Sequence, residues 1–261
     1  EVPQYDSISM APHYPPVDGV FYAMGSPVSD DCEALWDLVD HCAKHEELDR
    51  HWILAAVVTP FWGQVGGVKP VFAVTSDGQQ GAGKTTLCRT IARLASGIDR
   101  ANYYGVRSAS DMDNLPRAMG STGAMAETHR LVVIDNYRGA ALGSGEMEAM
   151  LTEDQVNCWK LYHGQVTLPN LFCWYVTGNA LDMSEDLASR SAQIKIRKPK
   201  KYSADWDEKL AAWDLDAVVG AIGRFFATKP SEISTVNRFP LWCREILGRI
   251  DARLVGDGSL A

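Results

Sequence analysis

The chain has 261 residues, a length that suits one large α/β domain or a core domain with small additions. Hydrophobic residues make up 46% of it, so we expect a sizeable folded core, and global disorder is excluded. The formal net charge of -8 excludes a protein coated in basic surface, although a local basic channel for nucleic acid can coexist with an acidic exterior.

The sequence shows no sign of membrane insertion or secretion. No apolar run reaches the length of a transmembrane helix, and no signal peptide opens the chain. The six cysteines stand singly without a C-x-x-C spacing, which favours reduced thiols. We therefore expect a cytoplasmic protein that does not bind membranes. Because the first residue is Glu rather than Met, we also expect a piece of a longer protein or a processed form.

Two helices are predicted before the main domain. Residues 1–28 carry five prolines with little periodicity and predict a linker or an arm lying on a neighbouring surface. Residues 29–69 predict an N-terminal helical segment. Its first helix has Ser29 or Asp30 as N-cap, and its second spans 47–62.

A phosphate-binding loop is the strongest motif of the chain. The stretch from Gly78 to Thr85, GQQGAGKT, fits G-x-x-x-x-G-K-[ST]. The glycines let backbone N–H groups approach phosphate oxygens, Lys84 meets the β/γ-phosphates of ATP, and the Thr85 hydroxyl completes the shell of a Mg²⁺ ion. The predicted nucleotide-binding residues are Gly78, Gly81, Ala82, Gly83, Lys84, Thr85 and Thr86.

The context of this loop is strand, loop, helix. Residues 70–76 predict a buried strand, and residues 84–96 predict a helix that ends at Gly97. Its apolar face is Leu87, Ile91 and Leu94. This order is what phosphate binding requires, because the helix N-terminus adds its dipole to the anion site.

Four further strands are expected, at 102–106, 130–135, 171–177 and 192–196. Strands alternating with helical patterns predict a parallel sheet with helices on both faces, hence an α/β P-loop NTPase (AAA+-like) fold with N-terminal and C-terminal helical additions. We assign residues 70–201 to the ATPase core and residues 202–261 to a C-terminal helical segment. Candidate core positions in that segment are Trp206, Leu210, Trp213, Val218, Ile222 and Phe225.

Asp135 closes the strand at 130–135, which is the Walker B arrangement. A carboxylate there can hold Mg²⁺ opposite Thr85. The next residue is Asn136, where many ATPases carry a Glu that polarises the attacking water, and an amide cannot accept that proton. The catalytic base is therefore left open among three nearby acids, Glu146, Glu148 and Glu153.

Three later residues are candidates for sensing the γ-phosphate. Asn179 closes the strand at 171–177 and predicts a sensor 1 side chain beside Asp135, unless it is a plain turn residue. Arg190 predicts an arginine finger that reaches the nucleotide of a neighbouring subunit, against an ordinary surface arginine or a local ion pair. Arg224 has two interpretations, a sensor 2 arginine that acts from the C-terminal helices or an ordinary surface residue.

Residues 158–168 predict a β-hairpin that turns at His163 and Gly164. A hairpin between the two polar strand ends could project into a pore, where Lys160 and His163 grip phosphates or stack on bases of nucleic acid. A purely structural hairpin is the alternative.

In these motifs the chain resembles AAA+ ATPases, and more narrowly the superfamily 3-like helicase domains of phage and mobile-element primase-helicases. The resemblance rests on GQQGAGKTT, LVVIDN, LTEDQVNCWKLYHG, VTGNALDMSEDLASR and FPLWCREILG. It implies a hexameric ring that hydrolyses ATP with Mg²⁺ at subunit interfaces and moves single-stranded DNA through its pore during replication. It also implies Walker A roles for Lys84 and Thr85, Walker B for Asp135, sensor 1 for Asn179 and the finger for Arg190.

Two functions of different class compete. The first is a nucleic-acid motor, a helicase or translocase, which the hairpin favours. The second is an ATP-gated assembly or loader protein with slow hydrolysis, which Asn136 favours. A metabolite kinase is disfavoured because no second substrate site or lid signature is visible.

Overall fold

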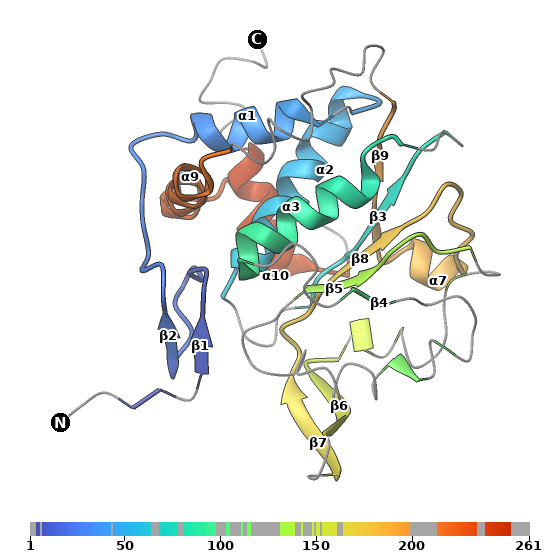
Figure 1. Cartoon of the computed structure of the whole chain (residues 1–261), viewed down its shortest axis with the longest axis horizontal. Helices are drawn as coiled ribbons and strands as arrows, with labels where there is room; N and C mark the ends of the chain where they lie inside the picture. The colour runs from blue at the N-terminus through green and yellow to red at the C-terminus, as the bar shows by residue number, and fades with distance from the viewer. Residues whose placement is uncertain are drawn as a thin grey trace.

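The computed structural model shows a layered α/β fold (Figure 1). It describes residues 4–5, 7–42, 44–63, 68–77, 81–97, 103–104, 111, 114–115, 131–138, 142, 148, 150–151, 153–160, 164–198, 213–233 and 238–251. Within these ranges no helix is long and apolar enough to cross a membrane.

A five-stranded parallel sheet forms the centre, in the order β4-β5-β8-β3-β9. The strands are β3 (Val71–Thr75), β4 (Tyr103–Tyr104), β5 (Leu131–Ile134), β8 (Cys173–Thr177) and β9 (Ser191–Lys195). All residues of β5 and β8 are buried, as expected for continuous apolar runs covered on both faces. The predicted parallel sheet is confirmed.

Alternate residues of β5 and β8 enter two separate apolar clusters. On β8, Cys173 and Tyr175 belong to the larger cluster, and Trp174 and Val176 to the smaller one. This follows from the two-residue period of a strand. Buried side chains from several helices complete the larger cluster. These helices include α1 (Glu33–His41), α2 (Glu47–Val58), α3 (Lys84–Ser96), α9 (Leu215–Ala227), α10 (Pro240–Trp242) and the π-helix η2 (Cys243–Leu247).

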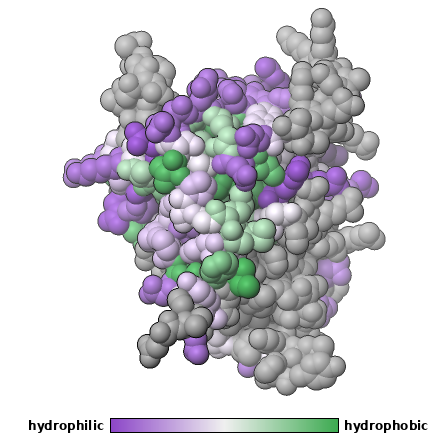
Figure 2. All heavy atoms as spheres, turned by 60° about the vertical axis from the view of Figure 1, so that its left-hand side comes forward, coloured by the Kyte–Doolittle hydropathy of each residue, from purple (hydrophilic) through white to green (hydrophobic). Residues whose placement is uncertain are grey.

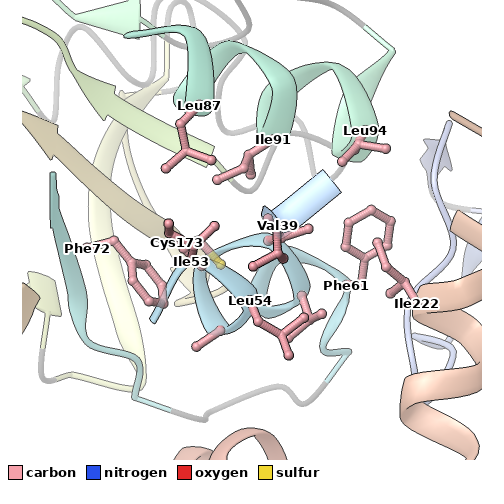
Figure 3. Close-up of a cluster of buried hydrophobic side chains, with 14 of the residues drawn as sticks. Val39, Ile53, Leu54, Phe61, Phe72, Leu87, Ile91, Leu94, Cys173 and Ile222 are labelled. Atoms are coloured by element: carbon pink, nitrogen blue, oxygen red, sulfur yellow. The ribbon is translucent and has the colours of Figure 1, made fainter. Parts of the chain in front are cut away.

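Helix α3 has the bounds that the sequence predicts, and its three predicted core residues are buried. Figure 3 shows Leu87, Ile91 and Leu94 pointing toward α2, where Ile53 and Leu54 lie. Burying one such side chain contributes roughly 1.5–3 kcal/mol. The helix ends at Gly97, which has a φ of 72° as the predicted stop requires.

The two predicted N-terminal helices form, but their ends differ from the prediction. Helix α1 begins at Glu33 with Cys32 as N-cap, so the predicted cap at Ser29 or Asp30 is wrong. The chain just before the helix is held against α9, since the backbone N–H of Ser29 donates to the carbonyl of Gly220 at 3.0 Å. The first N–H of the helix, that of Glu33, is satisfied by Asp31 Oδ1 at 2.9 Å.

The second helix changes type before the predicted end at residue 62. Helix α2 stops at Val58, and the 3₁₀-helix η1 continues over Thr59–Phe61. Pro60 has no N–H and cannot bond to the carbonyl of Ala56 four residues earlier. Tyr175 of β8 uses that carbonyl instead, since its hydroxyl donates to Ala56 O at 2.7 Å.

Part of the predicted N-terminal arm contacts the helices of this chain. Strands β1 (Ser7–Ser9) and β2 (Val20–Tyr22) pair in parallel. Tyr14, in the segment that connects these strands, donates its backbone N–H to the carbonyl of Phe61, and its ring stacks on that of Phe226. The arm also carries exposed apolar side chains, among them Ile8 and Phe21. Figure 2 brings this side forward and shows apolar patches among polar ones.

The predicted hairpin also forms. Strands β6 (Gln155–Lys160) and β7 (Gly164–Pro169) are antiparallel, and the pair stands away from the central sheet (Figure 1). In the C-terminal segment Val218, Ile222 and Phe225 are buried as predicted, and Trp213 packs partly against the core. Two predicted core positions, Trp206 and Leu210, lie outside the described residues.

The Asp49 carboxylate links the start of α2 to strand β9 by hydrogen bonds, and we expect the removal of this carboxylate to lower the free energy of unfolding. Its carboxylate is buried and accepts the backbone N–H of Glu46 at 2.8 Å and that of Lys195 on β9 at 2.9 Å. Asp49→Ala leaves both donors without their acceptor, which should lower the free energy of unfolding by about 2 kcal/mol in urea denaturation. The exposed Asp37→Ala on α1 is the control and should change it by less than about 0.5 kcal/mol. Equal urea midpoints for both variants would contradict this role.

Candidate nucleotide-binding site

Three polar chain segments meet at the carboxyl edge of the central sheet. The predicted phosphate-binding loop follows β3, Asp135 follows β5, and Asn179 follows β8 after one glycine. Strand β8 pairs with both β3 and β5. Because all three strands are parallel, their carboxyl ends lie at one edge, where open α/β sheets bind ligands.

The glycines of the loop adopt the backbone conformation that the motif needs. Gly81 has a φ of 73° and Gly83 a φ of 99°, while Gly78 and both glutamines lie outside the described residues. A Cβ at Gly81 or Gly83 would meet nothing within 4 Å, so positive φ rather than crowding requires glycine there. Gly83 is the N-cap of α3, which places the positive end of the helix dipole at the loop.

Lys84 lies between two neutral polar groups. Its Nζ donates to Ser76 Oγ at 2.7 Å and to Asn179 Oδ1 at 2.9 Å. Burial lowers the pKa of Lys84, and the negative charge of Asp135 opposes that shift. Within the described ranges no carboxylate lies at ion-pair distance from Nζ, so the ammonium group suits an anionic ligand.

The predicted metal pair is in direct contact. Thr85 donates from Oγ1 to Asp135 Oδ1 at 2.9 Å, and Thr177 donates from its own Oγ1 to the same oxygen at 2.7 Å. The described residues contain no group of three or more His, Cys, Asp or Glu side chains that could hold a metal. A hydroxyl beside one carboxylate fits Mg²⁺, which takes oxygen ligands and commonly completes its shell with water and substrate phosphates.

Asn136 turns the chain sharply after the Asp135 strand. Its φ is 56°, a left-handed conformation that Asn tolerates better than most residues. Its side-chain Oδ1 accepts from Arg138 Nε at 3.4 Å.

The three acids left open as catalytic base differ in their surroundings. The Glu148 carboxylate accepts from Ser184 Oγ at 2.9 Å, Glu153 is exposed, and Glu146 lies outside the described residues. None of these contacts assigns a base.

Arg190 occupies a different place from the Lys84 and Asp135 cluster. Its Nη2 forms an ion pair with Asp186 Oδ2 at 2.6 Å, its Nη1 lies 3.5 Å from the carbonyl of Glu148, and its side chain is 15% exposed. Arg238 shares Asp186 through a 2.7 Å contact but is 51% exposed. Partial burial raises the pKa of Asp186, but hydrogen bonds from Arg238 and Arg190 outweigh it and hold that pKa below its usual value. The role of Arg190 as a finger stays a prediction.

The other predicted residues are placed less fully. Arg224 is exposed in the last turn of α9. The backbone of Lys160 ends β6, opposite Gly164, whereas the Lys160 side chain and all of His163 lie outside the described part of the chain.

Sequence reasoning missed two hydroxyl residues of this site. Ser76 is the last residue before Asp77 and the loop, and it contacts Lys84. Thr177 ends β8 and contacts Asp135. Both stand at the carboxyl end of a strand, the position that singled out Asp135 and Asn179, and that signal could have found them.

The comparisons with known proteins show the fold. No protein-family model and no curated protein matches the chain. An apo structure of the NrS-1 C terminal region aligns with a TM-score of 0.53 and 13% identity, over 90% of this chain and 53% of that one. A second apo structure of that region gives a TM-score of 0.52 and 10% identity, over 89% and 53%.

The chain thus spans about half the length of the NrS-1 structures that it matches. A JCV Helicase structure aligns with a TM-score of 0.39 and 18% identity, over 91% of this chain and 64% of that one, which is too distant to support an argument. The chain therefore has the α/β fold of the P-loop NTPases with helical additions on both sides, and the resemblance stated from its motifs is confirmed as a likeness of fold.

Proposed function

We propose that this chain is an ATP-hydrolysing motor domain that translocates on or unwinds nucleic acid. The observation that carries the proposal is the pair of contacts at the sheet edge, Lys84 with Asn179 and Thr85 with Asp135. These four side chains come from the loop, from β5 and from β8, and they meet as phosphate and Mg²⁺ binding requires. In this proposal residues 70–201 are the ATPase core, between an arm and helical segment (1–28 and 29–69) and a C-terminal segment (202–261).

Each residue has a separate task toward ATP. The backbone of the loop from Gly78 to Gly83 and the first turn of α3, including Thr86, receive the phosphates with their N–H groups. Lys84 neutralises the β/γ-phosphates, and Asn179 orients the attacking water. Thr85 and Asp135 would hold Mg²⁺, which supplies positive charge to the phosphoryl group when bound.

The assembly that suits these parts is a ring of identical subunits, most simply a hexamer. A finger such as Arg190 acts on the nucleotide of a neighbouring copy, so the site is complete only between subunits. The hairpin β6–β7 would face the central channel, where Lys160 and His163 contact single-stranded DNA. A replicative role for a phage or a mobile element belongs to the same proposal.

Single-stranded DNA is expected to stimulate ATP hydrolysis, and Lys160→Ala with His163→Ala is expected to abolish that stimulation. Phosphate contacts and base stacking are lost with these two side chains, whereas the ATP site is untouched. The measurement is phosphate release with and without single-stranded DNA, alongside equilibrium binding of an ATP analogue, which should stay unchanged.

Gln155→Ala provides the matched control on the same hairpin. Gln155 is exposed and uncharged, and it lies opposite Pro169 at the far end from the turn. This variant should keep the stimulation. If neither DNA nor RNA changes the hydrolysis rate of the wild-type chain, the motor proposal fails.

One observation favours a second function, an ATP-gated assembly or loader protein with slow hydrolysis. Asn136 stands where a Glu would polarise water, and its amide cannot accept a proton. In that case ATP binding should change the oligomeric mass in solution, while turnover stays slow and indifferent to nucleic acid.

A further inference from the structure

Thr177 is a buried hydroxyl at the centre of the candidate site. It is the last residue of β8, and only 1% of its surface is exposed. Ile134 is paired with Val176, so the next residues along the two parallel strands, Asp135 and Thr177, lie side by side at the sheet edge. A polar side chain this deeply buried needs a hydrogen-bonding reason to be there.

The hydrogen bonds of Thr177 run in one direction. The backbone N–H of Asn136 donates to Thr177 Oγ1 at 2.7 Å, so this oxygen acts as acceptor there. The single hydroxyl hydrogen is then given to Asp135 Oδ1, also at 2.7 Å. The N–H···O distance is at the short end of its usual range, and the O–H···O distance lies within the range for a hydroxyl that donates to a carboxylate.

The turn after β5 holds Thr177 from two sides. Asn136 has a left-handed φ, and its backbone N–H donates to the Thr177 side chain. The next backbone N–H, that of Tyr137, donates to the Thr177 carbonyl at 2.8 Å. Asn136 therefore has a backbone role that is separate from any part in water activation.

Two hydroxyls thus reach the same oxygen of Asp135, and they belong to different parts of the fold. Thr85 lies on the first turn of α3, next to the loop that receives the nucleotide. Thr177 lies in the central strand of the sheet. A hydrogen bond from the sheet can fix the carboxylate independently of what the loop does.

We propose that Thr177 is a positioning residue that orients Asp135 toward the Mg²⁺ of a bound magnesium–nucleotide complex. This inference rests on the proposed function, because it concerns the same site. It gives Thr177 no contact with the nucleotide and no part in proton transfer. The consequence is specific: loss of the hydroxyl should weaken the nucleotide affinity only where that affinity depends on Mg²⁺.

The test compares Thr177→Val, which keeps the shape and removes the hydroxyl, with Thr177→Ser, which keeps the hydroxyl. Binding of a fluorescent ATP analogue is measured with Mg²⁺ and again with EDTA. For Thr177→Val we expect the gain in affinity on adding Mg²⁺ to fall by about 10- to 100-fold, as is typical when a partner of a metal ligand is lost. Metal-free affinity should stay within about twofold, and Thr177→Ser should resemble the wild type.

Thr75→Val is the matched control. Thr75 ends the neighbouring strand β3, and among the described residues its hydroxyl makes only a 3.5 Å contact with the carbonyl of Ile194. It should leave the Mg²⁺ dependence unchanged. Thermal unfolding of each variant without nucleotide shows whether it is folded, and Thr177→Cys, whose thiol is a weak donor, replaces Thr177→Val if the latter does not fold.

The inference is overturned if Thr177→Val, or Thr177→Cys in its place, binds the analogue with an unchanged Mg²⁺ dependence. It is also overturned if affinity falls equally with Mg²⁺ and with EDTA, since that marks a general structural defect. Failure of the proposed function looks different: Lys84→Ala would then bind and hydrolyse ATP like the wild type, whatever Thr177 does.

Discussion

Lys84→Ala is expected to weaken ATP binding by about 10- to 100-fold and to abolish measurable hydrolysis. The Lys84 ammonium group has only neutral partners among the described residues, Ser76 Oγ and Asn179 Oδ1. Phosphate would therefore gain a charge that is not already neutralised by a carboxylate. Hydrogen bonds to charged groups contribute about 1.5–3 kcal/mol each, and they matter more where charge develops during phosphoryl transfer.

Equilibrium binding of a fluorescent ATP analogue and phosphate release measure the two effects separately. Lys229→Ala is the control, because Lys229 is exposed just beyond α9 and its loss changes the net charge equally. Thermal unfolding is needed as well, since Lys84→Ala leaves the buried Ser76 without this contact. Undiminished hydrolysis by a folded Lys84→Ala protein would overturn the assignment of the whole site.

Local signals predict the elements that build this site well. The bounds of α3 follow from the periodicity of Leu87, Ile91 and Leu94 and from Gly97, and the structure agrees residue for residue. The two strands follow from a different signal. The continuous apolar runs before Asp135 and before Asn179 predict β5 and β8, because a strand covered on both faces must be apolar throughout.

Features that depend on distant partners escape such signals. The segment before α1 is held against α9 by a bond from the Ser29 N–H to the Gly220 carbonyl, and nothing in the sequence near Ser29 shows this distant partner. The role of Thr177 comes from a turn on another strand, where Asn136 takes a left-handed φ. Sequence reasoning considers Asn136 only for the chemistry of its side chain, whereas its backbone conformation is visible only in the fold.

Arg190→Ala is expected to leave ATP binding intact and to lower hydrolysis by about a thousandfold or more, the usual effect of removing an arginine finger. In this chain Arg190 binds Asp186 and the carbonyl of Glu148, away from the Lys84 cluster. In the proposed ring its side chain would act on the nucleotide of a neighbouring subunit. Phosphate release and analogue binding, measured at a protein concentration that supports assembly, give the two quantities.

Arg238→Ala separates a finger from a surface ion pair. Arg238 shares the Asp186 carboxylate with Arg190, so either variant leaves Asp186 with one arginine. Each change removes one positive charge beside Asp186, but Arg190 is the more buried side chain and also contacts the Glu148 carbonyl, so thermal unfolding is measured to show that each variant is folded. Only the loss of Arg190 should stop hydrolysis, while Arg238→Ala should retain it within about threefold.

An experiment that mixes two inactive variants tests whether Arg190 acts on the nucleotide of a neighbouring subunit. Lys84→Ala subunits lack the nucleotide site but keep Arg190, and Arg190→Ala subunits have the opposite defect. In a mixed assembly, a Lys84→Ala subunit can present its Arg190 to the intact nucleotide site of an Arg190→Ala neighbour, so the mixture should regain hydrolysis that neither protein shows alone. Normal hydrolysis by Arg190→Ala alone would remove the intersubunit site from the proposal, and an inactive mixture of two folded, co-assembled variants would mean that Arg190 serves its own subunit.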